Sequence, residues 1–249
     1  MVLEGTIPIE HTLPFVAFIV VNHGKYNANC TGSIIAPKYV LTAYHCLLTN
    51  GTTPTSPDAA TVRVGSQYKS KGRAYQVREY YITDKTSKSY KNWDDIVVLE
   101  LTQEILFDFL TTAAITLGRS TPRIGDTLTI AGHGIRIVQR RRLAIDSYVI
   151  GNVTVRRNSK YCKPVTNEFC AGGLKQGSAK GDSGGPAFKI INRKYVQVAL
   201  ITGGQHFHII DKSRRDYQLI GMYDHGTLLK IAPYCGYIQK ATGGAAYCQ

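Results

Sequence analysis

The residues best suited to chemistry lie in the segment Gly181-Asp182-Ser183-Gly184-Gly185-Pro186. A serine flanked by glycines can lie on a sharp turn that exposes its hydroxyl and lets a substrate backbone come close. The amides of Gly181 and Ser183 can then point into one small concavity and bind a developing oxyanion. The segment therefore predicts a nucleophilic serine with an oxyanion hole beside it.

A serine hydroxyl is a weak nucleophile, so this chemistry requires a base and an acid that orients the base. Two upstream stretches supply these groups. His45 follows the apolar run 40–43, and Asp95 precedes the apolar run 96–101. On spacing alone, Asp94 is a rival for the role of the acid. The sequence thus predicts a serine, a histidine and an aspartate that act together.

With this order and these neighbours, His45, Asp95 and Ser183 resemble the catalytic residues of the chymotrypsin/trypsin-type serine proteases. The resemblance selects Asp95 over Asp94, because the family's aspartate directly precedes the apolar run. It implies that Ser183 attacks a carbonyl while His45 takes up and returns the proton. We therefore expect a serine endopeptidase that works through an acyl-enzyme, with protein or peptide substrates and protein protease inhibitors as partners.

Short apolar runs that alternate with polar turns must position these residues. They predict strands and no long helix, which is typical of a barrel or sandwich. The resemblance implies two six-stranded antiparallel β-barrels and a C-terminal helix. We expect the first half, residues 1–117, to carry His45 and Asp95, and the second half, residues 118–249, to carry Ser183 and the helix. The predicted strands are 40–43, 61–64, 96–101, 127–131, 143–150 and 196–201.

The six cysteines form an even set, which suits disulfides in an oxidising compartment. The resemblance implies the pairs Cys30–Cys46 and Cys162–Cys170, and elimination leaves Cys235–Cys248. No cysteine–histidine spacing is typical of zinc, so we expect neither a metal nor another cofactor. The sequence shows no apolar run of eighteen residues, and we expect the chain to be a mature form without a signal peptide. We expect a secreted, extracellular monomer with no membrane span.

Val2 begins a short stretch, residues 2–6, that resembles the mature amino terminus of the family. In the family, cleavage of a zymogen frees this amine, which then pairs with the aspartate before the nucleophile. The resemblance implies an activation ion pair between Val2 and Asp182 that shapes the oxyanion hole. Because Met1 precedes Val2 in this chain, the pair requires removal of Met1.

The resemblance also identifies the substrate pocket. It places Gly177 at the base, where trypsin-like members carry an aspartate, and an uncharged base favours large apolar side chains. An aspartate at 211, 216 or 224 would reverse this preference if the chain folded it into the pocket. The other expected lining residues are Thr202, Gly203, Gly204 and Gly221.

Two alternatives remain open from the sequence. Gly203 replaces a wall-forming tryptophan of the family, and the loop 205–220 is longer than usual. That loop either supplies the missing wall or covers the pocket, so a catalytically weak or inactive protease-like protein that binds its target is the competing function. The net charge of +13 gives a cationic surface, which predicts weak polyanion binding.

Overall fold

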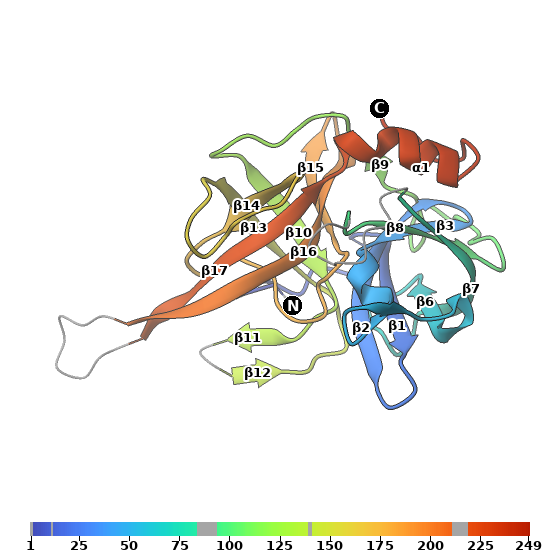
Figure 1. The fold of residues 1–249 in the computed structure, drawn as a ribbon. Helices are drawn as coiled ribbons and strands as arrows, with labels where there is room; N and C mark the ends of the chain where they lie inside the picture. Colours follow the sequence, from blue (N-terminus) through green and yellow to red (C-terminus); the bar gives the residue numbers. More distant parts are fainter. Residues whose placement is uncertain (1, 11, 84–93, 139–140, 211–218) are drawn as a thin grey trace.

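The computed structural model describes residues 2–10, 12–83, 94–138, 141–210 and 219–249. Six strands of the first half close into an antiparallel barrel in the order β1-β2-β3-β8-β7-β6 (Figure 1). Alternation along these strands directs apolar side chains inward; in β6, for example, Ala60, Val62 and Val64 are buried and the residues between them are partly exposed. The strands are β1 (Val16–Asn22), β2 (Asn27–Ala36), β3 (Tyr39–Thr42), β6 (Ala60–Val64), β7 (Arg73–Ile82) and β8 (Val97–Leu101).

The second half forms a seven-stranded sheet in the order β15-β10-β13-β14-β17-β16-β9. A further pairing of β15 with β16 joins six of these strands into a ring, and β9 lies parallel to β16 outside it. The all-β class with two barrels and a C-terminal helix is therefore confirmed. The strands are β9 (Thr116–Leu117), β10 (Thr127–Gly132), β13 (Val149–Arg156), β14 (Glu168–Gly172), β15 (Pro186–Ile191), β16 (Lys194–Ile210) and β17 (Leu219–Lys230).

Three details differ from the predicted elements. Residues 116–117 were assigned to the first half, but as β9 they pair with β16 of the second sheet. The predicted strand 143–150 is interrupted, because residues 144–148 lie between β12 and β13 and form no strand. The described residues of the predicted loop 205–220 instead extend the β16–β17 hairpin, which projects from the barrel (Figure 1). The short strands are β4 (Leu48–Thr49), β5 (Thr53–Pro54), β11 (Arg136–Val138) and β12 (Arg141–Leu143).

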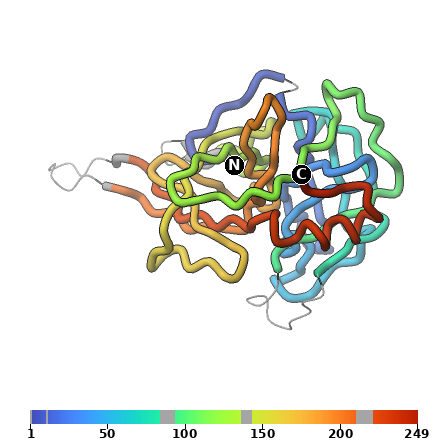
Figure 2. The backbone as a smooth tube through the Cα atoms, turned by 90° about the horizontal axis from the view of Figure 1, so that it is seen from above, coloured from blue at the N-terminus to red at the C-terminus, as the bar shows by residue number. Residues whose placement is uncertain are grey.

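Each chain end packs against the opposite half (Figure 2). Thr6 and Ile150 exchange two backbone hydrogen bonds, of 2.9 and 3.0 Å, so the amino-terminal segment lies on the second sheet. The helix α1 (Cys235–Ala241) lies on the first barrel, where the amide of Val98 donates to the Tyr237 hydroxyl at 3.1 Å. These crossed ends hold the two halves together. No helix within the described ranges is long and apolar enough to span a membrane.

An apolar core cluster joins the two halves. The main cluster extends from the first barrel to β15, β16 and α1, and a second cluster fills the other ring. Phe15 and Phe188, one from each half, meet edge to face at 5.5 Å between ring centroids. The three expected disulfides are present, linking Cys30 to Cys46, Cys162 to Cys170 and Cys235 to Cys248.

Candidate active site

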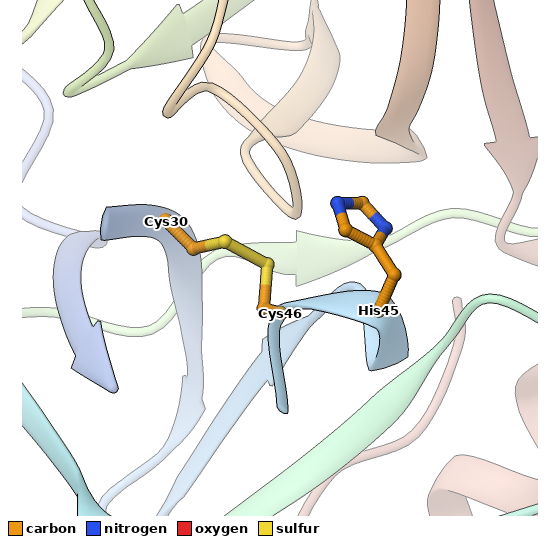
Figure 3. Close-up of side chains that lie close together, drawn as sticks. All are labelled: Cys30, His45 and Cys46. Carbon is orange, nitrogen blue, oxygen red and sulfur yellow. A yellow bond between two sulfur atoms is a disulfide. The ribbon is translucent and has the colours of Figure 1, made fainter. Parts of the chain in front are cut away.

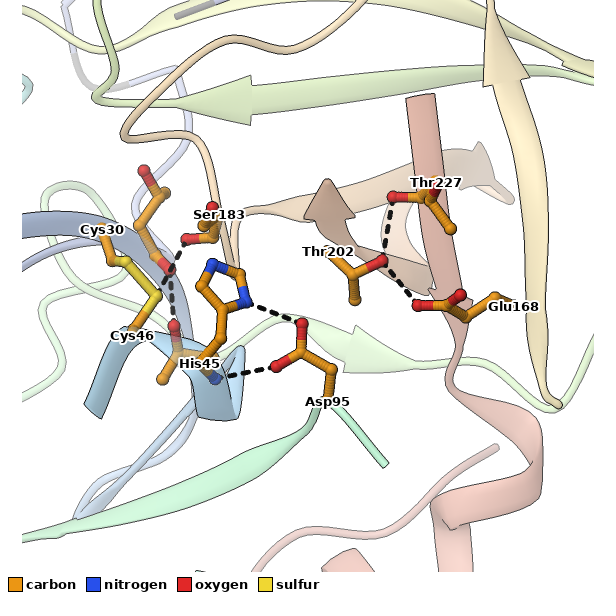
Figure 4. Close-up of polar contacts among 10 residues, drawn as sticks. Cys30, His45, Cys46, Asp95, Glu168, Ser183, Thr202 and Thr227 are labelled. Atoms are coloured by element: carbon orange, nitrogen blue, oxygen red, sulfur yellow. Dashed lines mark hydrogen bonds and ion pairs between the residues drawn. A yellow bond between two sulfur atoms is a disulfide. The ribbon is translucent and has the colours of Figure 1, made fainter. Parts of the chain in front are cut away.

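The pairing of β3 with β8 brings His45 and Asp95 together. Thr42, at the end of β3, lies opposite Val97, at the start of β8, so the turn after one strand meets the residue before the other. Asp95 Oδ2 lies 2.7 Å from His45 Nδ1, and Asp95 Oδ1 accepts the His45 amide at 2.8 Å (Figure 4). Because a carboxylate acceptor holds the proton on Nδ1, the other ring nitrogen keeps its lone pair for a hydroxyl proton.

Ser183 lies on a glycine-rich turn that is tied to both halves. Its carbonyl accepts the Thr31 amide at 2.9 Å, and the next amide, of Gly184, donates to Ile201 at 2.7 Å. The second nitrogen of the His45 ring faces Ser183 (Figure 4). The three residues chosen from the sequence as nucleophile, base and acid therefore come together at the junction of the two halves.

Two amides beside the nucleophile are available to an oxyanion. Gly181 has φ of +99°, and a Cβ there would lie 2.7 Å from Gly134 Cα, so a side chain is excluded. Within the described residues, the amides of Gly181 and Ser183 donate to no acceptor. Paired free amides next to a serine are the donors that a tetrahedral intermediate requires.

A second carboxylate, Glu168 of β14, lies near the histidine and was missed from the sequence. Its Oε1 lies 2.9 Å from the Thr202 hydroxyl, which is 3.1 Å from the Thr227 carbonyl (Figure 4). Burial lowers the pKa of His45, but the charge and hydrogen bond of Asp95, helped by Glu168, outweigh burial and raise it above its usual value. Burial also raises the pKa of Glu168. Nothing in its sequence neighbourhood indicated this role.

Asp94, the rival of Asp95, points elsewhere. It accepts a hydrogen bond of 2.7 Å from the Tyr234 hydroxyl. This hydroxyl also accepts a 3.2 Å bond from the side-chain amide of Asn167. Asp94 therefore belongs to the packing beneath α1, and the geometry favours Asp95 as the partner of His45.

The predicted pocket contains Asp224. Its side chain points toward Gly177, Gly204 and Gly226: added Cβ atoms at these positions would lie 2.1, 2.8 and 2.9 Å from its carboxylate oxygens. Only 1% of its surface is exposed. The pocket is therefore filled in this structure, because the carboxyl group of Asp224 takes the room that the glycines leave.

A histidine closes the same region. His206 Nε2 lies 2.5 Å from the Ser178 carbonyl, so it donates there, and 3.4 Å from Asp224 Oδ1. The Ser178 amide donates to Asp224 Oδ2 at 3.0 Å. Burial raises the pKa of Asp224 to about 8, and Asp182 adds to the rise while the Ser178 amide opposes it. His206 and His208 both lie on β16, where His206 is partly buried and His208 is exposed.

The glycine expected from the sequence at residue 221 does not border this pocket. A Cβ on Gly221 would meet Leu174 and Lys175, and Gly226 takes the place that was predicted for Gly221. The reason is strand alternation, since Asp224 and Gly226 are two residues apart on β17 and share a face. This pattern is the signal that could have identified both residues. A Cβ on Gly203 would meet nothing within 4 Å, so the wall is bare there.

Comparison with known proteins agrees with this geometry. Residues 4–207 match the family model described as Trypsin. The chain belongs to the trypsin family. Chymotrypsin of Phaedon cochleariae is 28% identical over 202 residues, which are 74% of this chain and 68% of that protein. Coagulation factor IX of Oryctolagus cuniculus is 26% identical over 203 residues, covering 78% and 72%.

A solved structure shares the fold over nearly the whole chain. It is the crystal structure of scabies mite inactivated protease paralogue S-I1, with a TM-score of 0.71 and 19% identity, covering 96% of this chain and 98% of that chain. The trypsin family model ends at residue 207, inside β16. The outer part of the β16–β17 hairpin therefore lies beyond the match.

The amino-terminal segment lies beneath the oxyanion turn. Val2 is fully buried in the second cluster, and the Leu3 amide donates to the Gly177 carbonyl at 2.8 Å. Asp182, also fully buried, accepts the amides of Gly134 at 2.9 Å and Ala179 at 2.8 Å. The pairing of Asp182 with a free Val2 amine stays a prediction.

Cys30, His45 and Cys46 place their sulfur and nitrogen atoms within 4.8 Å of one another (Figure 3). The two sulfurs are joined in a disulfide, with an S–S distance of 2.01 Å. A disulfide offers no thiolate to a metal ion. This group therefore anchors the turn that carries His45 and does not form a metal centre.

Proposed function

We propose that this protein is a secreted serine endopeptidase that cleaves peptide bonds through an acyl-enzyme. The contact of Asp95 Oδ2 with His45 Nδ1, at 2.7 Å, carries the proposal, because it sets the ring nitrogen that faces Ser183 as a proton acceptor. Membership of the trypsin family supports it.

The reaction follows from these positions. Ser183 Oγ bonds to the substrate carbonyl carbon while its proton passes to His45, and the amides of Gly181 and Ser183 bind the oxyanion. As the C–N bond breaks, His45 returns the proton to the leaving amine. Water then attacks the acyl-enzyme with His45 as base, which frees the acid product and regenerates Ser183.

Covalent labelling tests the proposal without requiring the substrate pocket. A small alkyl fluorophosphonate should modify Ser183 of the wild-type protein, as measured by intact mass and peptide mapping. The variants Ser183→Ala and His45→Ala should remain unlabelled, and Lys194→Met, a surface change on β16, should be labelled at the wild-type rate. A folded wild-type protein that stays unlabelled would refute the proposal.

One observation favours a second candidate, a protease-like protein that binds its target and cleaves it slowly or not at all. Asp224 fills the hollow into which the side chain before the cleaved bond must enter. The preference for large apolar residues that the sequence suggested required this hollow to be empty and neutral. Under this candidate, peptide substrates show little or no turnover, and a folded protein that fluorophosphonate leaves unlabelled would support it.

The activation ion pair is part of the proposal. A protein that begins at Val2 would offer its amine to Asp182, and this contact would stabilise the turn that holds Gly181. We expect a form that begins at Val2 to be labelled faster than one that retains Met1, compared at equal folded concentration. Equal labelling rates would show that the turn forms without the pair.

A further inference from the structure

A second hollow meets the candidate nucleophile on the side away from Asp224. This cleft of about 480 Å³ is bordered by His45, Ser183, Gly181 and the Cys30–Cys46 disulfide. None of Gly177, Gly204, Gly226 and Asp224, which enclose the other hollow, borders it. The two hollows share only the turn around Ser183. We call the second one the leaving-group cleft.

The chemistry of the proposed reaction determines which part of the substrate lies in each hollow. The side chain before the cleaved bond belongs to the acyl part and lies toward Gly177, past the oxyanion amides. The amine that leaves must receive its proton from His45, so the chain that follows the cleaved bond runs into the hollow that His45 borders. Residues lining the leaving-group cleft therefore contact the substrate after the cleaved bond.

The leaving-group cleft is positively charged. Lys69 and Lys180 border it, and its lining includes no aspartate or glutamate. The Lys69 ammonium lies 5.6 Å from the centroid of the Phe18 ring, and within the described part of the chain neither lysine has a carboxylate within 4.0 Å. Asp146, a nearby carboxylate, has both oxygens bonded to Ser70. An incoming anion would therefore give these charges a partner that the described residues do not supply.

Of the two lysines, Lys69 is stabilised more by an incoming anion. It is half-buried, and burial lowers the pKa of its ammonium, an effect that the charges of Asp146 and Asp182 partly offset. A half-buried ammonium without a bonded carboxylate is a costly arrangement, and an anion that reaches it forms a stronger contact than it would in open water. Lys180 is exposed and adds a second charge at the rim.

We propose that Lys69 and Lys180 make the leaving-group cleft a site for an acidic side chain, aspartate or glutamate, carried by the substrate just after the cleaved bond. The inference rests on the proposed function, because that function gives the cleft its substrate. Substrates with lysine or arginine there are rejected, since like charges would meet in a partly buried space.

Binding to the variant Ser183→Ala tests the inference without turnover. Two fluorescent peptides carry Ala before the cleaved bond, since Asp224 leaves little room there, and differ only by Glu or Gln in the residue that directly follows the cleaved bond. Fluorescence anisotropy at low salt should show the Glu peptide binding about five- to tenfold more tightly. The difference should vanish at high salt, because screening weakens exposed charge pairs.

Variants in the same background assign the effect to the two lysines. Lys69→Met and Lys180→Met should each reduce the preference for Glu over Gln, whereas Lys194→Met, on a surface outside the cleft, should keep it. Circular dichroism melting checks that Lys69→Met remains folded. Because Lys180 is exposed, Lys180→Met tests the preference for Glu without a risk to folding. Equal affinities of the two peptides in a folded Ser183→Ala protein overturn the inference.

The result for the acidic site can be distinguished from the result for the proposed endopeptidase activity. Fluorophosphonate labelling with no Glu preference keeps the endopeptidase and removes the acidic site. A lysine-dependent Glu preference without labelling keeps the site but assigns it to a protein that binds and does not cleave. Lysine-dependent binding of a heparin oligosaccharide together with equal peptide affinities would overturn the inference in favour of a polysaccharide site.

Discussion

The carboxylate of Asp224 lies against Gly177, at the base of the pocket beside Ser183. A Cβ added to Gly177 would lie 2.1 Å from Asp224 Oδ2, so the two positions compete for one space. Gly177 leaves the base of the pocket free. Asp224, on the strand β17, fills this space from one side with its carboxyl group. The availability of the pocket therefore depends on a side chain that is distant in sequence from the candidate nucleophile Ser183.

Removing the Asp224 side chain should open the pocket to large apolar residues. We expect Asp224→Gly to raise kcat/KM by about tenfold or more for peptides cleaved after Phe, Tyr or Leu, because a filled apolar pocket contributes about 1.5–3 kcal/mol. Chromogenic peptides that differ only in this residue measure the effect. Asp224→Asn, which keeps the volume, is the control and should give no such gain. Loss of cleavage after Arg or Lys, with no gain after Phe, would instead identify Asp224 as the partner of a basic side chain.

Asp224 should also make stability fall as the pH rises. Its pKa is about 8 in the folded protein and about 3.9 in an unfolded chain. Its contribution is therefore complete below pH 4 and is lost as the pH rises through 8. Asp224→Asn removes this titration and should become more stable than wild type toward pH 9, by an amount on the order of 5 kcal/mol. Urea unfolding at pH 5 and pH 9 measures the change, and a difference that does not depend on pH contradicts the prediction.

His133 should have the opposite effect on stability: it should make the protein less stable as the pH falls into the acidic range. It is buried between Phe18 and Tyr148, and its Nδ1 has no hydrogen-bond partner among the described residues. Burial, with Lys69, lowers its pKa to about 3, so its contribution to stability is present above pH 6.5 and is lost as the pH falls toward 3.

We therefore expect His133→Phe, which keeps the ring contacts, to lose less stability than wild type between pH 6.5 and pH 4. Thermal unfolding across this range is the measurement. His208→Gln changes an exposed histidine on β16 and serves as the control. If His133→Phe and wild type lose stability in parallel, the buried ring is not the source of acid sensitivity.

Glu168 should set the pH at which Ser183 becomes reactive. Its charge helps to raise the pKa of His45, and His45 must be neutral to accept a proton. The fluorophosphonate labelling rate of wild type should therefore fall as the pH decreases, and Glu168→Gln should move the midpoint of this fall to lower pH. Glu104→Gln, a change at an exposed site, should leave it in place. A midpoint that Glu168→Gln does not move would show that Glu168 acts only through packing.

The sequence by itself determined which residues form the candidate active site. Gly181 and Gly184 next to Ser183 indicate a turn that only glycine adopts easily, and both have positive φ in the structure. His45 and Asp95 adjoin apolar runs that become β3 and β8, so the order of strands already favoured their meeting. Such features are local, because each depends on residue types within a few positions.

The tertiary structure alone decided what surrounds that centre. The extent of β16 and β17 depends on their pairing with each other, and this pairing turns Asp224 inward and moves the expected role of Gly221 to Gly226. Glu168 and Lys69 approach the site from strands and loops far along the chain. Burial and charge at these residues are sums over the whole fold, and for this reason no local pattern in the sequence could specify them.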